Sequence, residues 1–88
     1  SVLVLECIPS DLAKTISEKL TIPTIGIGAG VHCDGQVLVS YDMLGITTGK
    51  QPRFVRNFLS NQITISDAVE SFVLEVKEGR FPSESESY

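Results

Sequence analysis

Residues 2–28 read VLVLECIPSDLAKTISEKLTIPTIGIG and combine strand and helix patterns within one short stretch. The run Val2–Leu5 is continuously apolar, which is typical of a strand covered on both faces of a parallel sheet. A second strand, with glycines where something must pack closely or the chain must bend, is predicted over residues 24–28. Between the two strands, apolar residues recur at four-residue spacing and predict a helix with one apolar face: Leu12, Ile16 and Leu20.

The ends of this helix carry signals of their own. Ser10 is predicted to cap its N-terminus, and Asp11 then lies in the first turn, where the helix dipole favours an acidic side chain. Pro23 ends the helical pattern, because proline disfavours a helical conformation in the residue before it. The stretch therefore predicts strand, helix and strand, which is the pattern of a parallel sheet with a right-handed crossover.

The remainder of the chain continues this alternation. A third short strand is predicted over residues 36–39, and residues 54–58 suggest one or two helical turns. A last helix is predicted to begin after Thr64, with Asp67 completing a capping signature, and to end at Gly79. Its apolar face is predicted to consist of Ile65, Val69, Phe72, Val73 and Val76.

Three strands alone would leave two open sheet edges and bare sheet faces. The chain also opens at Ser1 without an initiator methionine and enters its first strand almost at once. We therefore expect the 88 residues to be a piece of a larger α/β domain. Residues 83–88 are acidic and polar, and we expect them to form a flexible tail.

The composition narrows the classes of function. A chain of 88 residues suffices for one small domain with a modest core. Seven basic against eleven acidic residues give a net charge of −4, and scattered lysines and arginines lack the footprint of nucleic-acid binding. No apolar run reaches the roughly 18 residues of a membrane span. Cys7 and Cys33 lack the spacing of a zinc site and are expected to be free thiols in a reducing compartment.

Glu6 is the first candidate for chemistry. It follows the apolar run at the carboxyl end of the first strand and shares a face with Val2 and Val4. If that face is interior, desolvation raises the pKa of the carboxyl toward values suited to a general base. The competing interpretation is a glutamate that ends a strand and turns to solvent.

The glycine cluster Gly26-x-Gly28-x-Gly30 is the second candidate. It does not match the dinucleotide fingerprint, because Val31 or Cys33 stands where the third glycine is required. Two interpretations remain open: a strand end that lines a pocket, and a tight turn.

The remaining polar candidates favour structural roles. His32, Cys33 and Asp34 are consecutive, and neighbouring side chains diverge too much for a good metal site. Asp34 precedes Gly35 and is expected to serve a turn. Asp42 is either a helix N-cap or a site residue, and the cap is favoured.

Several short motifs, taken in order, resemble one known family. They are LECIP at 5–9, IGIGAG at 25–30, DGQVLV at 34–39, DMLG at 42–45, Pro52-x-Phe54-Val55 and Gly79-x-Phe81-Pro82. Each is weak alone, but the ordered set resembles the C-terminal third of the ketopantoate hydroxymethyltransferase (3-methyl-2-oxobutanoate hydroxymethyltransferase) family.

The resemblance implies a (β/α)8 barrel of the phosphoenolpyruvate/pyruvate type. Residues 1–82 would supply about three β/α units at the C-terminal end of this single barrel domain, followed by the acidic tail 83–88. A complete barrel needs about 250 residues, which agrees with the expectation that this chain is a fragment.

The resemblance also implies an activity. The family transfers a hydroxymethyl group from 5,10-methylenetetrahydrofolate to 3-methyl-2-oxobutanoate, giving 2-dehydropantoate for pantothenate and coenzyme A biosynthesis. Glu6 matches the family's proton acceptor, and Gly28, Ala29 and Gly30 are expected to wall the substrate pocket. Mg2+ is the implied cofactor, held by residues upstream of this segment, which itself is expected to supply no metal ligand.

Further expectations follow from the same resemblance. The partners would be the keto acid, the folate and further copies of the chain in a homo-oligomer, a decamer in the family, with no nucleic acid and no membrane. The location would be cytoplasmic in a bacterium and mitochondrial in a fungus or plant, without secretion. The 88 residues alone are expected to be inactive.

Two alternatives stay open. One is a non-catalytic truncated remnant or interaction module, whose exposed sheet edges would favour association. The other is a different barrel enzyme that holds a phosphate at the glycine-rich strand end Gly28–Gly30, which would leave Glu6 unexplained.

Overall fold

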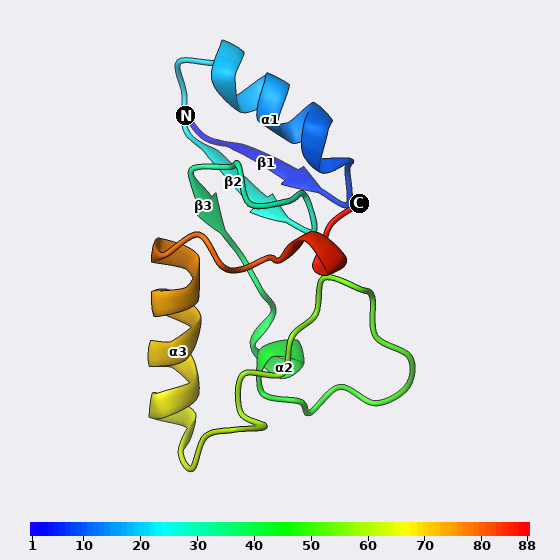
Figure 1. Cartoon of the computed structure of the whole chain (residues 1–88), viewed down its shortest axis with the longest axis vertical. Coiled ribbons are helices and arrows are strands. Elements are labelled where there is room, and N and C mark those ends of the chain that lie inside the picture. Colours follow the sequence, from blue (N-terminus) through cyan, green and yellow to red (C-terminus); the bar gives the residue numbers. More distant parts are fainter.

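A computed structural model describes the whole chain, residues 1–88. Its centre is a three-stranded parallel sheet with strand order β1-β2-β3 (Figure 1). β1 spans Leu3–Glu6, β2 spans Thr24–Ile27 and β3 spans Gly35–Gln36. Helix α1, Ser10–Lys19, connects β1 to β2 and confirms the predicted strand–helix–strand unit.

The second half of the chain lies largely beyond the sheet. The short helix α2, Ser40–Met43, follows β3, and a long loop leads from it to helix α3, Ile65–Lys77. The chain then returns to the sheet and ends with the 3-10 turn η1, Glu84–Glu86. α1 and α3 occupy opposite ends of the molecule, and the C-terminus lies beside the end of β1 (Figure 1). None of the helices combines the length and apolar character needed to cross a membrane.

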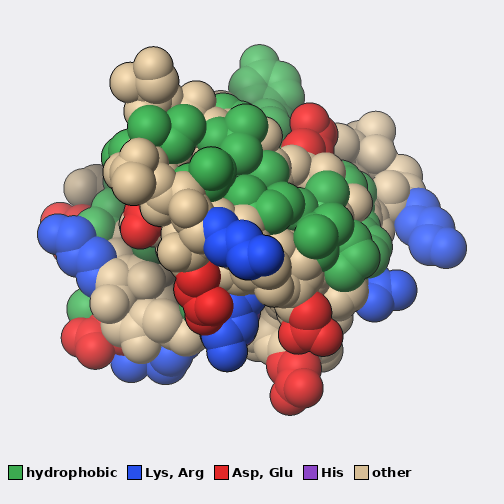
Figure 2. All heavy atoms as spheres, turned by 90° about the horizontal axis from the view of Figure 1, so that it is seen from above, with side chains coloured by type: hydrophobic (Ala, Val, Ile, Leu, Met, Phe, Trp, Pro, Cys, Tyr) green, Lys and Arg blue, Asp and Glu red, His purple; other side chains and the backbone are tan.

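One face of the sheet is covered by α1. Leu5 of β1, Ala13 of α1 and Ala29 after β2 form a small buried cluster. Because side chains alternate along a strand, Val2 and Val4 point to the opposite face. These two valines are 56% and 60% exposed, so nothing within the chain covers that part of the sheet. Viewed from the α1 end, exposed apolar side chains form a band bordered by charged ones (Figure 2).

The larger core lies between the sheet and α3. Three of its phenylalanine rings meet edge to face, with ring centres 5.3–5.8 Å apart: Phe58, Phe72 and Phe81. The buried members of this core are Leu38, Met43, Phe54, Phe58, Ala68 and Phe81. Only 14 of the 88 residues are buried, which confirms the modest core expected from the chain length.

The predicted helices exist, but their buried faces differ from the predicted ones. In α1 the predicted Ile16 packs against the buried cluster, but Leu12 and Leu20 are 49% and 38% exposed. The fully buried residue of the helix is Ala13, whose small side chain allows close approach to the sheet. In α3 the packing residues are Ala68, Phe72 and Val76. Val69 and Val73 lie on the exposed flank, because the contact with the other phenylalanine rings orients the helix around Phe72.

The helix ends test the capping predictions. The hydroxyl of Thr64 accepts a hydrogen bond from the Asp67 N–H at 3.1 Å, and Gly79 follows α3 with a φ of 72°, so both predictions are confirmed. The predicted Ser10 cap is wrong. Ser10 is the first helical residue, Pro9 precedes it, and no side chain caps the helix.

Two further predictions are corrected by the structure. The third strand is Gly35–Gln36 rather than 36–39, because the chain leaves the sheet toward α2 after the Val37 N–H donates to the Gly26 carbonyl. Residues 54–58 form no helix: turns lie at residues 53–54 and 58–61, and residues 55–57 between them are irregular. Their backbone is used in a tertiary contact instead, since the Phe58 N–H donates to the Met43 carbonyl at 2.8 Å.

Candidate functional site

Glu6 ends β1, as predicted, at the carboxyl end of the parallel sheet. It lies opposite Ile27 in the register and shares the uncovered face with Val4. In the chain as it stands this face is open, so the Glu6 side chain is exposed and its carboxylate makes no hydrogen bond or ion pair with other residues. The location suits a group that acts on a ligand held at the carboxyl ends of the strands. Its role as a base stays a prediction.

The backbone turns sharply directly after Glu6. Cys7 has a φ of 52°, a left-handed conformation that costs a non-glycine residue about 1 kcal/mol or more. The Cys7 N–H donates to the Ile27 carbonyl at 2.9 Å and ties the turn to β2. The turn fixes the direction in which the chain leaves Glu6.

The glycine-rich segment after β2 is explained in this chain by packing. A Cβ on Gly28 would lie 2.6 Å from Cδ2 of Phe54, and a Cβ on Gly30 would lie 2.3 Å from Cβ of Ser10. Ala29 between them is fully buried with Leu5. Both glycines also have positive φ, 68° and 83°. The structure thus gives the tight-turn interpretation a physical basis, and the expected substrate-pocket wall stays a prediction.

Replacing Gly30 by alanine is expected to destabilise the protein by about 2 kcal/mol. The new methyl group would collide with Ser10 at the start of α1 and would occupy a left-handed backbone position. Urea unfolding of the native chain that contains this segment measures the effect. Gly49→Ala is the matched control: its φ is 87°, but an added Cβ meets nothing within 4 Å, so it isolates the backbone strain. Equal losses in both variants would contradict the predicted collision.

A polar network holds the strand that precedes these glycines. Thr24 is fully buried, its N–H donates to a carboxylate oxygen of Asp34 at 2.8 Å, and its hydroxyl lies 2.7 Å from that of Ser17 in α1. Asp34 therefore joins two segments rather than serving only the turn that the sequence suggests. Nearby, the Gln36 side-chain amide donates to the Gly30 carbonyl at 2.8 Å and fixes the glycine-rich segment. Neither contact was predicted, because no local spacing marks them.

The other candidates are placed as follows. Asp42 is not an N-cap, since α2 already begins at Ser40 and Val39 precedes it. His32 is exposed, at the rim of a cavity of about 290 Å³ between the start of α1 and the C-terminal residues. No three His, Cys, Asp or Glu side chains come together in a way that could hold a metal ion. The residues of this chain therefore do not fit a Mg2+ site.

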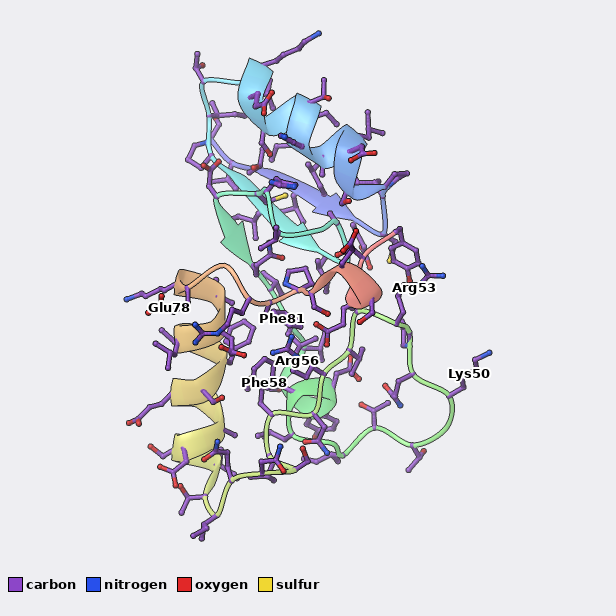
Figure 3. All side chains as sticks on the ribbon, viewed as in Figure 1. Lys50, Arg53, Arg56, Phe58, Glu78 and Phe81 are labelled. Atoms are coloured by element: carbon purple, nitrogen blue, oxygen red, sulfur yellow. The ribbon has the colours of Figure 1, made fainter.

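An ion-pair network centred on Arg56 was missed at the level of sequence. Its guanidinium lies over the rings of Phe58 and Phe81, 5.2 and 5.0 Å from their centres (Figure 3). It pairs with Glu86 at 2.6 Å and with Glu75 of α3 at 3.1 Å. The hydrogen bond with Glu86 raises the pKa of Arg56, against the opposing effect of burial.

The C-terminal residues are engaged by this network. Burial opposes the ionisation of Glu86, but hydrogen bonds from Arg56 and from Ser83 outweigh it and lower the pKa of Glu86. Ser83 and Glu86 cap η1 reciprocally. Arg53 donates to the Ser87 carbonyl and lies over the Tyr88 ring. These contacts give residues 83–88 a defined conformation and oppose the flexibility expected of them.

Comparison of the sequence with known proteins shows which family the chain belongs to. The family model described as ketopantoate hydroxymethyltransferase matches residues 1–84. The chain belongs to the ketopantoate hydroxymethyltransferase family. This membership confirms the resemblance seen in the sequence motifs, and the family is one of transferases. The roles of Glu6 and of the glycine-rich segment stay predictions.

Relatives from distant organisms match nearly the whole chain. The 3-methyl-2-oxobutanoate hydroxymethyltransferase of Ruthia magnifica is 61% identical over 87 residues, which are 99% of this chain and 34% of the relative. That of Neisseria meningitidis is 54% identical over 83 residues, 94% of this chain and 32% of the relative. The probable 3-methyl-2-oxobutanoate hydroxymethyltransferase of Schizosaccharomyces pombe is 52% identical over 86 residues, which are 98% of this chain and 32% of the relative. The chain thus spans about a third of the length of these ketopantoate hydroxymethyltransferases.

Proposed function

We propose that the chain is the C-terminal part of a 3-methyl-2-oxobutanoate hydroxymethyltransferase and supplies the catalytic base, Glu6. The observation that carries the proposal is the identity of 50% or more with named members over nearly all of the chain. The position of Glu6 supports it, because the residue ends a parallel strand on a face that the rest of a larger protein can cover.

The complete fold that we propose is a (β/α)8 barrel of the phosphoenolpyruvate/pyruvate type. In such a barrel one strand face packs against the surrounding helices and the other fills the interior. The sheet here has that arrangement in part: Leu5 packs against α1, while Val2 and Val4 are uncovered. Covering these valines with further strands would also exclude water from Glu6, which lies on the same face.

The proposed reaction needs a base at one carbon. Glu6 removes the proton from C3 of 3-methyl-2-oxobutanoate, and the electron pair of that C–H bond moves toward the adjacent ketone as an enolate. C3 then forms a bond to the one-carbon unit of 5,10-methylenetetrahydrofolate, and both C–N bonds of that unit break in the overall reaction. Water supplies the hydroxyl group. One folate nitrogen takes up the proton removed from C3 and the other takes up the remaining proton of the water, so tetrahydrofolate and 2-dehydropantoate leave. The product serves pantothenate and coenzyme A biosynthesis.

The remaining components of the enzyme lie outside these residues. We propose that Mg2+ is held by residues that precede this segment in the longer protein, because no cluster within the chain could hold a metal ion. We also propose that the protein is a homo-oligomer. Both rest on the family to which the chain belongs.

Product formation by the longest native chain that contains these residues tests the proposal. With 3-methyl-2-oxobutanoate, 5,10-methylenetetrahydrofolate and Mg2+, we expect 2-dehydropantoate to appear in the NMR spectrum. 3,3-Dimethyl-2-oxobutanoate is the matched control substrate, because it has no proton on C3 and must yield no product. A folded chain that binds the keto acid but forms no product would favour the non-catalytic remnant.

A further inference from the structure

The C-terminal residues touch the segment that follows Glu6. The backbone N–H of Ser10, at the start of α1, points to the carbonyl of Tyr88 at 3.4 Å. Figure 1 shows the C-terminus and η1 beside the arrow tip of β1. Three residues separate Glu6 from Ser10, so Tyr88 lies against the start of α1, just beyond the short segment that follows Glu6.

The same C-terminal residues are fixed from the other side by arginines. Arg56 donates from Nε and Nη2 to the two carboxylate oxygens of Glu86, at 2.9 and 2.6 Å. A further N–H of Arg56 reaches Glu75 at 3.1 Å, which anchors the arginine to α3. Arg53 donates to the Ser87 carbonyl at 3.2 Å, and its guanidinium lies 4.7 Å from the centre of the Tyr88 ring. Figure 3 shows Arg53 and Arg56 approaching the C-terminal segment from the loop before α3.

We propose that residues 83–88 form a C-terminal clamp, held by the Arg56–Glu86 pair, that positions the loop after Glu6 for catalysis. Arg56 and Glu86 are then positioning residues that do not touch the substrate. The clamp rests on the proposed function in one respect, namely that Glu6 is the base.

The need for a clamp follows from the geometry of the loop. A catalytic group must be held to within about 0.5 Å of its productive position, and loops are more mobile than the elements they connect. The bond from Cys7 to Ile27 fixes one end of the segment between Glu6 and α1. The contact of Ser10 with Tyr88 fixes the other end. Arg53 holds Ser87 and Tyr88, and the Arg56–Glu86 ion pair anchors the turn that precedes them.

The test uses the longest native chain with Glu86→Ala, and Glu84→Ala as its matched control. Glu84 lies in the same turn and is exposed, and its side chain makes no hydrogen bond or ion pair. We expect Glu86→Ala to lower kcat for C3 deuterium exchange about 10-fold with KM changed less than about 2-fold, since misplacement of a base affects the chemical step. Glu86→Gln, which keeps both acceptor positions in part, is expected to recover part of the loss. Glu84→Ala is expected to leave both parameters unchanged.

A second measurement tests the clamp independently of enzyme activity. Backbone amide hydrogen exchange of residues 7–12 is expected to rise about 10-fold in Glu86→Ala and to stay unchanged in Glu84→Ala. Unchanged amide exchange in Glu86→Ala would overturn the clamp even if the enzyme is active. If amide exchange rises in Glu86→Ala but the wild-type chain shows no C3 exchange, the contact stands and the proposed function is overturned instead.

A second variant, Tyr88→Ala, tests the clamp if Glu86→Ala fails to fold. Tyr88→Ala leaves the Arg56–Glu86 pair intact and removes the ring that Arg53 covers. We expect it to raise amide exchange over residues 7–12 and to lower kcat, both by a smaller factor than Glu86→Ala. A folded Tyr88→Ala protein with wild-type amide exchange and wild-type kcat would contradict the clamp.

Discussion

Replacing Glu6 by glutamine is expected to lower the rate of C3 deuterium exchange in 3-methyl-2-oxobutanoate by about 10³-fold or more. Glutamine keeps the size of the side chain but cannot accept the proton, and a positioned general base contributes about 10² to 10⁴ in rate. Exchange is measured by NMR in deuterated buffer with Mg2+, using the longest native chain that contains the segment. The assay needs no folate, so it isolates proton removal from transfer.

The variant should fold like the wild-type protein. Glutamine matches glutamate in size, and the Glu6 side chain makes no ion pair or hydrogen bond within these residues, so the replacement should cost little stability. Mg2+ binding should also be unchanged. Glu18→Gln is a suitable control, because it makes the same change at an exposed position of α1. Full exchange in Glu6→Gln would exclude Glu6 as the base.

The position of Glu6 could be predicted from sequence because it depends on local pattern. The continuous apolar run Val2–Leu5 defines a strand, and its end is marked by the glutamate itself. The capping of α3 by Thr64 was equally predictable, since the hydrogen bond spans only three residues. Both features are decided by neighbours in the chain, so no knowledge of the tertiary fold was needed.

The faces of the helices could not be predicted in the same way. Four-residue spacing selects an apolar stripe that includes Leu12, but contact with the sheet is made through Ala13. Which flank of an amphipathic helix is buried depends on its neighbours, and the relatives that this chain matches are about three times as long. Additional chain of that length could cover the exposed Leu12 of α1 and Val4 of β1.

The C-terminal segment could not be predicted for a different reason. Its composition is that of a flexible tail, with three serines and two glutamates over residues 83–87. What orders it in the structure is Arg56, which lies 30 residues earlier than its partner Glu86 and 19 residues before Glu75. No local spacing marks a pairing of this length. The same distance makes the network informative, because it joins the loop before α3, α3 itself and the C-terminus.

Replacing Arg56 by alanine is expected to destabilise the native protein by about 3 kcal/mol. The change removes both ion pairs and the contacts with Phe58 and Phe81, and it leaves the largely buried carboxylate of Glu86 without its cation. Removing one partner of a fully buried pair costs about 3–5 kcal/mol, and the lower end applies because Arg56 keeps 27% of its side chain exposed. Urea unfolding measures the loss, with Arg53→Ala as the control for an arginine in the same loop that makes no ion pair.

The pH dependence of unfolding provides an independent signature of the same network. The folded protein lowers the pKa of Glu86 below its ordinary value of 4.5, so the native state binds this proton less readily than the unfolded state does. The stability gained is therefore fully present above about pH 4.5 and is lost as the pH falls through the lower, folded pKa. In Arg56→Ala the hydrogen bond and the charge of Arg56 are lost, and only the hydrogen bonds from Ser83 still act against burial. The stability curve below pH 4.5 should therefore become flatter than in the wild-type protein. Parallel curves for the two proteins in this range would show that Arg56 does not control the ionisation of Glu86, and the clamp would lose its anchor.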